Sequence, residues 1–228
     1  VETLTTQGNL TPTLAERIEA ATTRSELEDL YLPYRPKRRT RAEIARERGL
    51  GPLAELLLAG REQIPEPVPD TVAEPFITDE VPDVRAALDG ARDILCERFA
   101  EDADLVGALR AYLRERAVLR AEVVSGKEAE AAKFSDYFDH REPWARVPGH
   151  RAQAMLRGRS EGLLALDLEI DQDLPETQRP VEKMIARAFS ITGDGGSTNA
   201  WLRDVVRWTW RVRLSVNLSA DLMVELRQ

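Results

Sequence analysis

The apolar positions of the chain recur mainly at helical spacing. The clearest pattern begins after Asp83, which can accept hydrogen bonds from the first amides of a helix, and its apolar face returns every three or four residues as far as Phe99. A second amphipathic pattern covers residues 102–124, and further helices are predicted at about 180–190 and 200–213. The pattern as a whole predicts an all-α, multihelical protein.

Helix-start signals near the amino terminus predict short helices. A threonine or serine can accept a hydrogen bond from a free amide of the first turn, and a glutamate three residues later can return the bond to form a capping box. Between two of these helices, Pro33 and Pro36 predict a stiff, extended elbow. The signals are, in chain order, Thr11 before Pro12, Ser25 with Glu28, and Thr40 with Glu43 before a closing Gly49.

Residues 162–171 break the helical period, because leucine and isoleucine alternate there with alanine and acidic residues. This two-residue period is typical of a β-strand, and it is the only good strand signal in the sequence. A lone strand leaves its edges unpaired, so we expect it to pair either with an irregular segment such as 137–147 or with a partner outside the chain. The predicted fold is therefore a two-lobed helical scaffold with at most a minor β element near 163–170.

Proline and charge patterns divide the chain into three predicted regions. Residues 1–60 form a short-helix region with the proline elbow and a basic segment, residues 61–82 an acidic, proline-rich connector, and residues 83–228 a multihelical domain. The chain lacks an initiator methionine, so we expect it to be a piece of a longer protein. Its last helix is expected to pack on the next domain of that protein, and to fray or self-associate without it, through Leu218, Leu222, Met223 and Leu226.

The segment 137–147 contains large aromatic side chains within a polar sequence. We expect Tyr137, Phe138 and Trp144 to be buried enough to hold an irregular backbone in place, because each ring removes a large apolar area from water.

The charge balance restricts any nucleic-acid site to a local patch. The chain has 40 acidic residues against 32 lysines and arginines, a net charge of -8, and residues 60–104 alone hold 13 acids against 4 arginines. A protein with this charge balance does not have the overall positive surface that proteins use to wrap duplex DNA. One cysteine, Cys96, excludes an internal disulfide framework and favours a reducing, cytoplasmic environment. No apolar run reaches the roughly 20 residues of a membrane span.

Catalytic and metal chemistry find little support in the sequence. His140 and His150 have acidic neighbours, but their spacing matches no metal-ligand motif, so turn and helix-entry roles are favoured over a metal-dependent nuclease. The glycine-rich segment 192–199 precedes a helix but lacks the lysine of a phosphate-binding loop, and Cys96 lies on an apolar face as an inert thiol. We therefore predict no enzyme, no cofactor and no metal.

Binding surfaces are better supported, because 12 of the 28 arginines and 4 lysines fall into three clusters. Arginine suits phosphate oxygens and base stacking, although arginines on a helix face are often only solvated or paired with acids. We expect Arg35 or Arg39 to be held by acids or carbonyls, and Lys37, Arg38 and Arg41 to project as a positive patch. The clusters are Arg35, Lys37, Arg38, Arg39 and Arg41 beside Tyr31 and Tyr34; Arg146, Arg151, Arg157 and Arg159 beside Trp144; and Arg203, Arg207 and Arg211.

Four blocks of the sequence, in this order and spacing, resemble the amino-terminal half of the bacterial Tex family of transcription accessory proteins. The blocks are LEDLYLPYRPKRRTRAEIARERGLGPLA, GARDILCERF, KFSDYFDHREPWARVPGHRAQAMLRG and WLRDVVRWTWRVRL. The resemblance implies a multidomain, cytoplasmic protein that binds nucleic acid. In that family a helical region with a helix-turn-helix-like part precedes a ribonuclease-H-like domain, helix-hairpin-helix elements and an OB-fold RNA-binding domain.

The resemblance places the main nucleic-acid contact in domains beyond this chain. The arginines here are then accessory contacts to single-stranded RNA or DNA, and the expected partners include the remaining domains of the parent protein but no membrane. The alternative is a protein-interaction module that docks RNA polymerase or another transcription protein.

Overall fold

The computed structural model describes residues 11–31, 39–60, 62–63, 65–171, 174–175, 179–191, 193 and 195–227. The chain folds into two compact units, each built from two separate stretches of sequence. Unit 1 comprises Val1–Gly107 and Glu182–Arg213, and unit 2 comprises Ala108–Val181 and Leu214–Gln228. No helix within the described ranges is long and apolar enough to cross a membrane.

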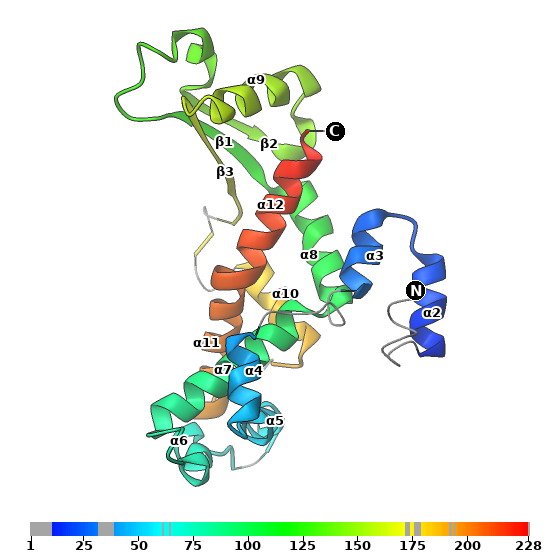
Figure 1. Ribbon diagram of the computed structural model, residues 1–228, viewed down its shortest axis with the longest axis vertical. Helices are drawn as coiled ribbons and strands as arrows, with labels where there is room; N and C mark the ends of the chain where they lie inside the picture. The colour runs from blue at the N-terminus through cyan, green and yellow to red at the C-terminus, as the bar shows by residue number, and fades with distance from the viewer. Residues whose placement is uncertain are drawn as a thin grey trace. The chain divides into compact units, whose positions relative to one another are not determined.

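Most of the secondary structure is helical, as the sequence predicted (Figure 1). The helices that lie wholly or mostly in unit 1 are α2 (Pro12–Ala20), α3 (Arg24–Tyr31), α4 (Arg41–Glu47), α5 (Gly51–Gly60), α6 (Pro69–Ala73), η2 (Glu74–Phe76), α7 (Val84–Ala100), α10 (Pro180–Ala188), α11 (Ser197–Thr209) and the π-helical turn η6 (Trp210–Leu214). Those of unit 2 are α8 (Ala103–Arg116), η3 (Ala132–Tyr137), η4 (Trp144–Arg146), α9 (Gly149–Ser160) and α12 (Ser215–Glu225).

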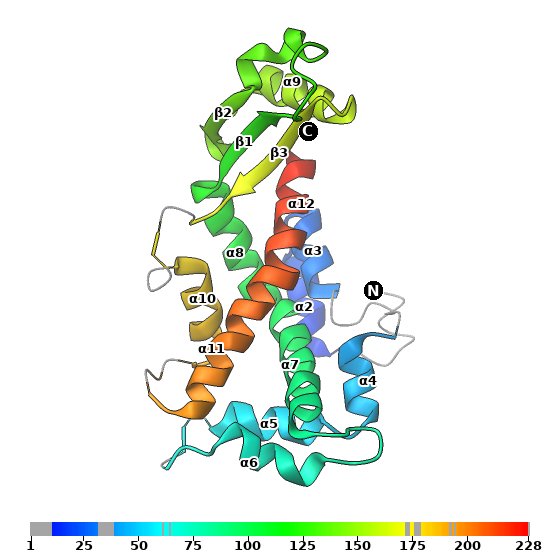
Figure 2. The ribbon, with the colours of Figure 1, turned by 90° about the vertical axis from the view of Figure 1, so that its left-hand side faces the viewer.

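Helix α7 is the centre of unit 1. Asp83 caps it as predicted, accepting a hydrogen bond from the amide of Ala86 at 2.7 Å. Helices α4, α5, α6 and α11 pack around it (Figure 2). Its inward face is fully buried at Ala91, Leu95 and Phe99. The amphipathic pattern read from the sequence is therefore the pattern by which unit 1 builds its core.

Helix α4 has a complete start and stop signal. The Thr40 hydroxyl accepts from the amide of Glu43 at 3.0 Å, and the Glu43 carboxylate accepts from the amide of Thr40 at 3.4 Å, which confirms the predicted capping box. At the other end Gly49 adopts a φ of 79°, and the amide of Leu50 donates to the carbonyl of Ala45, so the last turn closes as a Schellman motif.

We expect Thr40→Ala to lower the free energy of unfolding by about 0.5–2 kcal/mol, because the amide of Glu43 loses its acceptor. Thr40→Ser should retain most of the stability. Thr13→Ala, at an exposed position inside α2, is the matched control and should have almost no effect. Urea denaturation of the three variants measures these differences, and equal losses at Thr40 and Thr13 would show that the cap does not stabilise α4.

Two predicted helix starts differ in outcome. Thr11 caps α2 and accepts from the amide of Leu14 at 3.2 Å, as expected. The box predicted for Ser25 and Glu28 is wrong, because Thr23 and Glu26 form it: each side chain accepts from the amide of the other residue, at 3.2 and 3.1 Å. The helix begins two residues earlier than the sequence signal suggested.

Unit 2 contains a three-stranded antiparallel sheet in the order β2-β1-β3. Its strands are β1 (Val118–Val123), β2 (Asp139–Pro143) and β3 (Leu164–Glu169). The predicted strand is thus confirmed as β3, but its expected pairing with 137–147 is wrong, because β1 lies between the two. The helix predicted over residues 102–124 ends at Arg116, since Leu119 and Ala121 alternate with polar residues and bury one face of a strand.

Helix α9 packs against one face of this sheet (Figure 1). Met155 is fully buried, and Gly158 lies so close to Leu164 of β3 that a Cβ added there would be 2.6 Å from the leucine side chain. Glycine at this position therefore lets the helix approach the strand.

The aromatic residues near β2 pack against a small core of their own. That core contains Phe134 and Leu164, and Tyr137 and Phe138 are partly buried against it. The expectation that aromatic rings anchor this segment agrees with these contacts. Residues 139–143, however, form strand β2, so the backbone there is regular.

The prediction that the last helix lacks a partner within the chain is wrong. Leu218 and Leu222 of α12 are 1% and 0% exposed. Arg110 of α8 pairs with Asp221 at 3.0 Å, and Arg114 pairs with Glu225 at 2.7 Å. Both partners advance by four residues, so the two helices run in the same direction side by side, and α12 completes the core of unit 2.

Candidate nucleic-acid interface

The basic segment before α4 is only partly described by the structure. Arg35, Lys37 and Arg38 lie outside the described residues. Arg39 is exposed and donates from Nη2 to Oε2 of Glu47 at 2.5 Å, so an acid holds it, as expected for Arg35 or Arg39. This carboxylate also raises the pKa of the Arg39 guanidinium.

Arg41 is the first residue of α4 and is exposed. It forms no ion pair with any residue that the structure describes, which fits the expected projecting patch. Its charge still acts on α7: burial raises the pKa of Asp93, and the positive charges of Arg92 and Arg41 oppose that shift.

The second predicted cluster separates into one bound arginine and several exposed ones. Arg151 donates from Nη1 to Oε1 of Glu142 on β2 at 2.9 Å, and Oε2 of the same carboxylate lies 3.3 Å from Nε2 of His140. Arg151 therefore fixes α9 on the sheet and is not a free binding group. The other three residues of the cluster are exposed and have no ion pair within the described parts of the chain: Arg146, Arg157 and Arg159.

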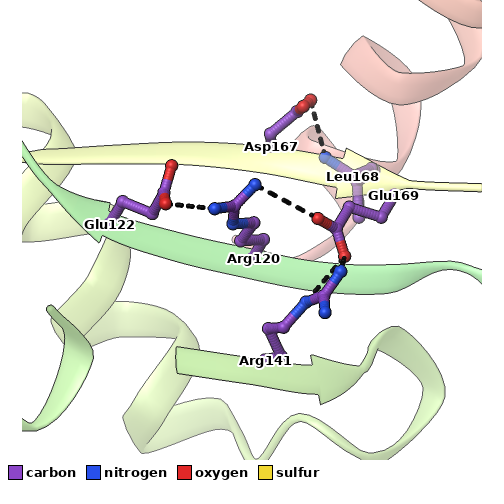
Figure 3. A network of polar contacts seen from close by, with 6 residues as sticks. All are labelled: Arg120, Glu122, Arg141, Asp167, Leu168 and Glu169. Atoms are coloured by element: carbon purple, nitrogen blue, oxygen red, sulfur yellow. Dashed lines mark hydrogen bonds and ion pairs between the residues drawn. The ribbon is translucent and has the colours of Figure 1, made fainter. Parts of the chain in front are cut away.

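The arginines on the opposite face of the sheet have a structural role (Figure 3). Arg141 donates from Nε to Oε2 of Glu169 at 2.8 Å and also from Nη2, while Arg120 donates to Oε1 at 3.4 Å. Arg120 contacts Glu122 as well. Glu169 is only 6% exposed. A buried carboxylate needs such partners, so this pair of arginines belongs to the fold.

The third cluster, Arg203 and Arg207 on α11 and Arg211 on η6, also has partners within the chain. Arg203 donates to the backbone carbonyl of Gly193, and Arg207 lies 3.4 Å from Asp204 and 3.9 Å from Glu182. Arg211 likewise has an interaction partner. Arg203 and Arg207 therefore connect α11 to neighbouring segments of unit 1, and each of the three arginines has an interaction partner.

The glycine-rich segment before α11 is not a phosphate-binding loop in the prediction, and a carboxylate of the same unit binds the start of this helix. Glu66 accepts from the amide of Asn199 at 2.6 Å and from its side-chain amide at 2.7 Å. Thr198 donates to the carbonyl of Pro67. The helix start thus binds the proline-rich segment of the same unit.

The positions of the two histidines and the cysteine are explained by structural roles. His140 contacts the edge of the Tyr137 ring, and His150 is exposed. Within the described residues no group of three or more histidine, cysteine or acidic side chains could hold a metal ion. Cys96 is 4% exposed, and burial raises the pKa of its thiol.

Comparison with known proteins shows the family. Residues 64–228 match the family model described as Tex central region-like. This chain belongs to the Tex family. The match covers unit 2 completely, and therefore includes the exposed arginines around α9, whereas the basic segment before α4 precedes it.

Relatives of this Tex chain are close but much longer. The Transcriptional accessory protein Tex of Neisseria gonorrhoeae is 49% identical over 97% of this chain and 28% of its own length. Protein YhgF of Escherichia coli is 47% identical over 100% of this chain and 30% of its own length. Protein tex of Bordetella pertussis is 44% identical over 100% of this chain and 29% of its own length. The Tex chain therefore spans less than a third of these relatives.

Sequence reasoning did not distinguish bound from exposed arginines in the second cluster of the Tex chain. The sequence places Arg151 in the same basic cluster as Arg146 and Arg157, although Glu142 binds it. Glu142 and Arg151 are nine residues apart, and only the packing of α9 on the sheet brings them together, so no local signal in the sequence identifies the pair. The surface that remains, Arg146, Arg157 and Arg159, is called the α9 arginine surface below.

Proposed function

We propose that this Tex chain is the helical scaffold of a cytoplasmic, transcription-associated protein, and that it contacts single-stranded nucleic acid, RNA above all, through the α9 arginine surface. The name of the Neisseria gonorrhoeae relative, Transcriptional accessory protein Tex, supports the association with transcription. The observation that carries the binding proposal is that these arginines are exposed without ion pairs to the described residues, while carboxylates bind Arg120, Arg141 and Arg151 of the same unit.

The arginines of the α9 arginine surface lie at both ends of the helix, and Arg157 and Arg159, two residues apart, project from different sides of it. Helix α9 has 12 residues, and Arg146 precedes it while Arg157 lies in its last turn. A helix of that length spans about 18 Å. Guanidinium groups suit phosphate oxygens, and the partly exposed ring of Trp144 beside Arg146 offers a stacking surface for a base. The arrangement suits a sequence-tolerant, salt-dependent contact that supports a stronger site elsewhere in the protein.

A structural explanation exists for two of these arginines. Arg157 and Arg159 lie in the last turn of α9, where positive charges offset the negative end of the helix dipole. That effect uses no specific partner and stabilises a helix by about 0.3–1 kcal/mol at exposed sites. A purely structural role therefore predicts a small loss of stability with unchanged binding.

We expect the triple variant Arg146→Glu, Arg157→Glu and Arg159→Glu to bind a fluorescein-labelled single-stranded RNA about tenfold more weakly at low salt, because three phosphate contacts become repulsive. The matched control reverses three exposed arginines elsewhere, Arg48, Arg187 and Arg227, and so changes the net charge by the same amount. Fluorescence anisotropy measures both. Equal weakening in the two triples would show that only net charge matters.

The scaffold is proposed to have no catalysis of its own. The remote alternative, metal-dependent cleavage at His140 and His150, has no ligand set among the described residues. Incubation of the same RNA with Mg²⁺ or Mn²⁺ tests it: cleavage by the wild-type chain that disappears in His140→Ala would establish an enzyme.

A further inference from the structure

Unit 1 contains a groove that the proposed contact with nucleic acid does not use. It has a volume of about 580 Å³ and is lined by residues of α6, the turn after η2, the start of α7 and α11. These elements pack together in unit 1 (Figure 2). Binding sites for small ligands and side chains commonly have volumes of about 300–1,000 Å³. Its lining residues are Asp70, Ile77, Pro82, Asp83, Val84, Arg85, Leu88, Asp89 and Trp201.

The lining combines an apolar surface with acidic residues. Ile77 is 43% exposed, although it is a large aliphatic side chain, and Trp201 is only partly buried. Three carboxylates line the groove against one guanidinium, and Asp70 makes no ion pair within the described parts of the chain. Asp83 caps α7 with one oxygen, and Asp89 pairs with Arg92 at 2.9 Å while its side chain stays 46% exposed.

The charge around the groove decides which class of partner fits. Its lining residues other than Trp201 lie in the stretch 60–104, which contains 13 acidic residues and 4 arginines, so phosphate-bearing ligands are repelled. A cationic side chain is attracted by the carboxylates and can also lie over the Trp201 ring. An apolar side chain can cover Ile77 and Leu88.

We propose that this groove docks a short segment of a partner protein in which a large apolar side chain stands next to arginine or lysine. The apolar residue covers Ile77 and Leu88, and the cation approaches Asp70 and the face of Trp201. The surface is separate from the α9 arginine surface, so docking and nucleic-acid binding are independently testable.

The test uses the 228-residue chain and a fluorescein-labelled peptide containing Leu-Arg pairs separated by glycine. We expect the peptide to bind, and matched peptides with glutamate for arginine, or serine for leucine, to bind at least tenfold more weakly, a difference of about 1.4 kcal/mol. Equal binding of all three peptides, or binding of none, would overturn the proposal.

Two pairs of variants locate the site. Asp70→Lys and Ile77→Ser should each weaken peptide binding about fivefold, through lost charge attraction and lost apolar contact respectively. Glu80→Lys and Leu56→Ser change exposed residues outside the groove in the same way and should change binding less than twofold. RNA binding should be unchanged in Ile77→Ser. Equal effects in the control variants would contradict the assignment.

Sedimentation of the chain without peptide tests the other occupant of the groove, a second copy. We expect the wild-type chain and Ile77→Ser to sediment alike. A wild-type dimer that Ile77→Ser dissociates would show that the groove is covered by another copy, and the proposal of a partner peptide would then be wrong.

Discussion

Phe99→Ala is expected to lower the free energy of unfolding of unit 1 by about 3–5 kcal/mol. Phe99 is fully buried on α7, and its ring stacks on that of Phe189 with the centroids 4.0 Å apart. The substitution removes the largest fully buried side chain of the chain's described part, leaves a cavity beside a packed helix and also removes an aromatic pair. Stabilities of natural domains are only about 5–15 kcal/mol, so unit 1 of this variant should be close to unfolding at 37 °C.

Tryptophan fluorescence during urea denaturation measures this loss. Trp201, Trp208 and Trp210 belong to unit 1, and only Trp144 belongs to unit 2, so the signal reports mainly on the unit that contains Phe99. Leu56→Ala, at a side chain that is 49% exposed, is the control and should cost little. A loss below 1 kcal/mol for Phe99→Ala would show that α7 is not the centre of the core.

The double variant Arg120→Met and Arg141→Met is expected to destabilise unit 2 by about 3 kcal/mol, the lower end of the range for a broken buried ion pair. Glu169 is 6% exposed, and both guanidinium groups bind its carboxylate. Without them the charge stays buried with no cation to offset its desolvation. The arginine side chains themselves are 38% and 51% exposed, so solvent screening keeps the loss near the lower limit.

The triple variant that adds Glu169→Leu separates the charge effect from packing. Removing the carboxylate removes the buried charge, so most of the stability should return, within about 1 kcal/mol of the wild-type chain. Hydrogen exchange of the β1 and β3 amides follows the stability of the sheet directly. If the triple variant is no more stable than the double variant, the arginines stabilise the sheet by packing and not by neutralising Glu169.

The helices of this fold could be read from local patterns, whereas β1 could not. Asp83 and the spacing of apolar residues predicted α7, and Thr40 with Glu43 predicted the start of α4. In residues 118–123 the apolar positions fit the helical spacing of α8, but apolar and polar residues also alternate there. Only the pairing of this segment with β2 and β3 makes it a strand. The pairing partners are distant in sequence, so no local signal could reveal them.

The same limit applied to the candidate interface. Arg141 pairs with a carboxylate 28 residues away, and Arg110 with one 111 residues away, so the sequence could not show which arginines were already bound. It also could not show that α12 packs inside unit 2, because an apolar helix face looks the same whether its partner lies in this chain or in another domain. The residue types predicted a basic surface, and the structure shows that Arg146, Arg157 and Arg159 are its exposed arginines without ion pairs to described residues.

The salt dependence of RNA binding tests the proposed function most directly. For single-stranded nucleic acid the slope of log K against log salt is about -0.7 per neutralised phosphate. The charge-removing triple variant Arg146→Gln, Arg157→Gln and Arg159→Gln should therefore flatten the slope by about 2, while the corresponding glutamine variant of Arg48, Arg187 and Arg227 leaves it unchanged. An unchanged slope in the α9 triple, with both variants folded, would show that these arginines make no contact with phosphate.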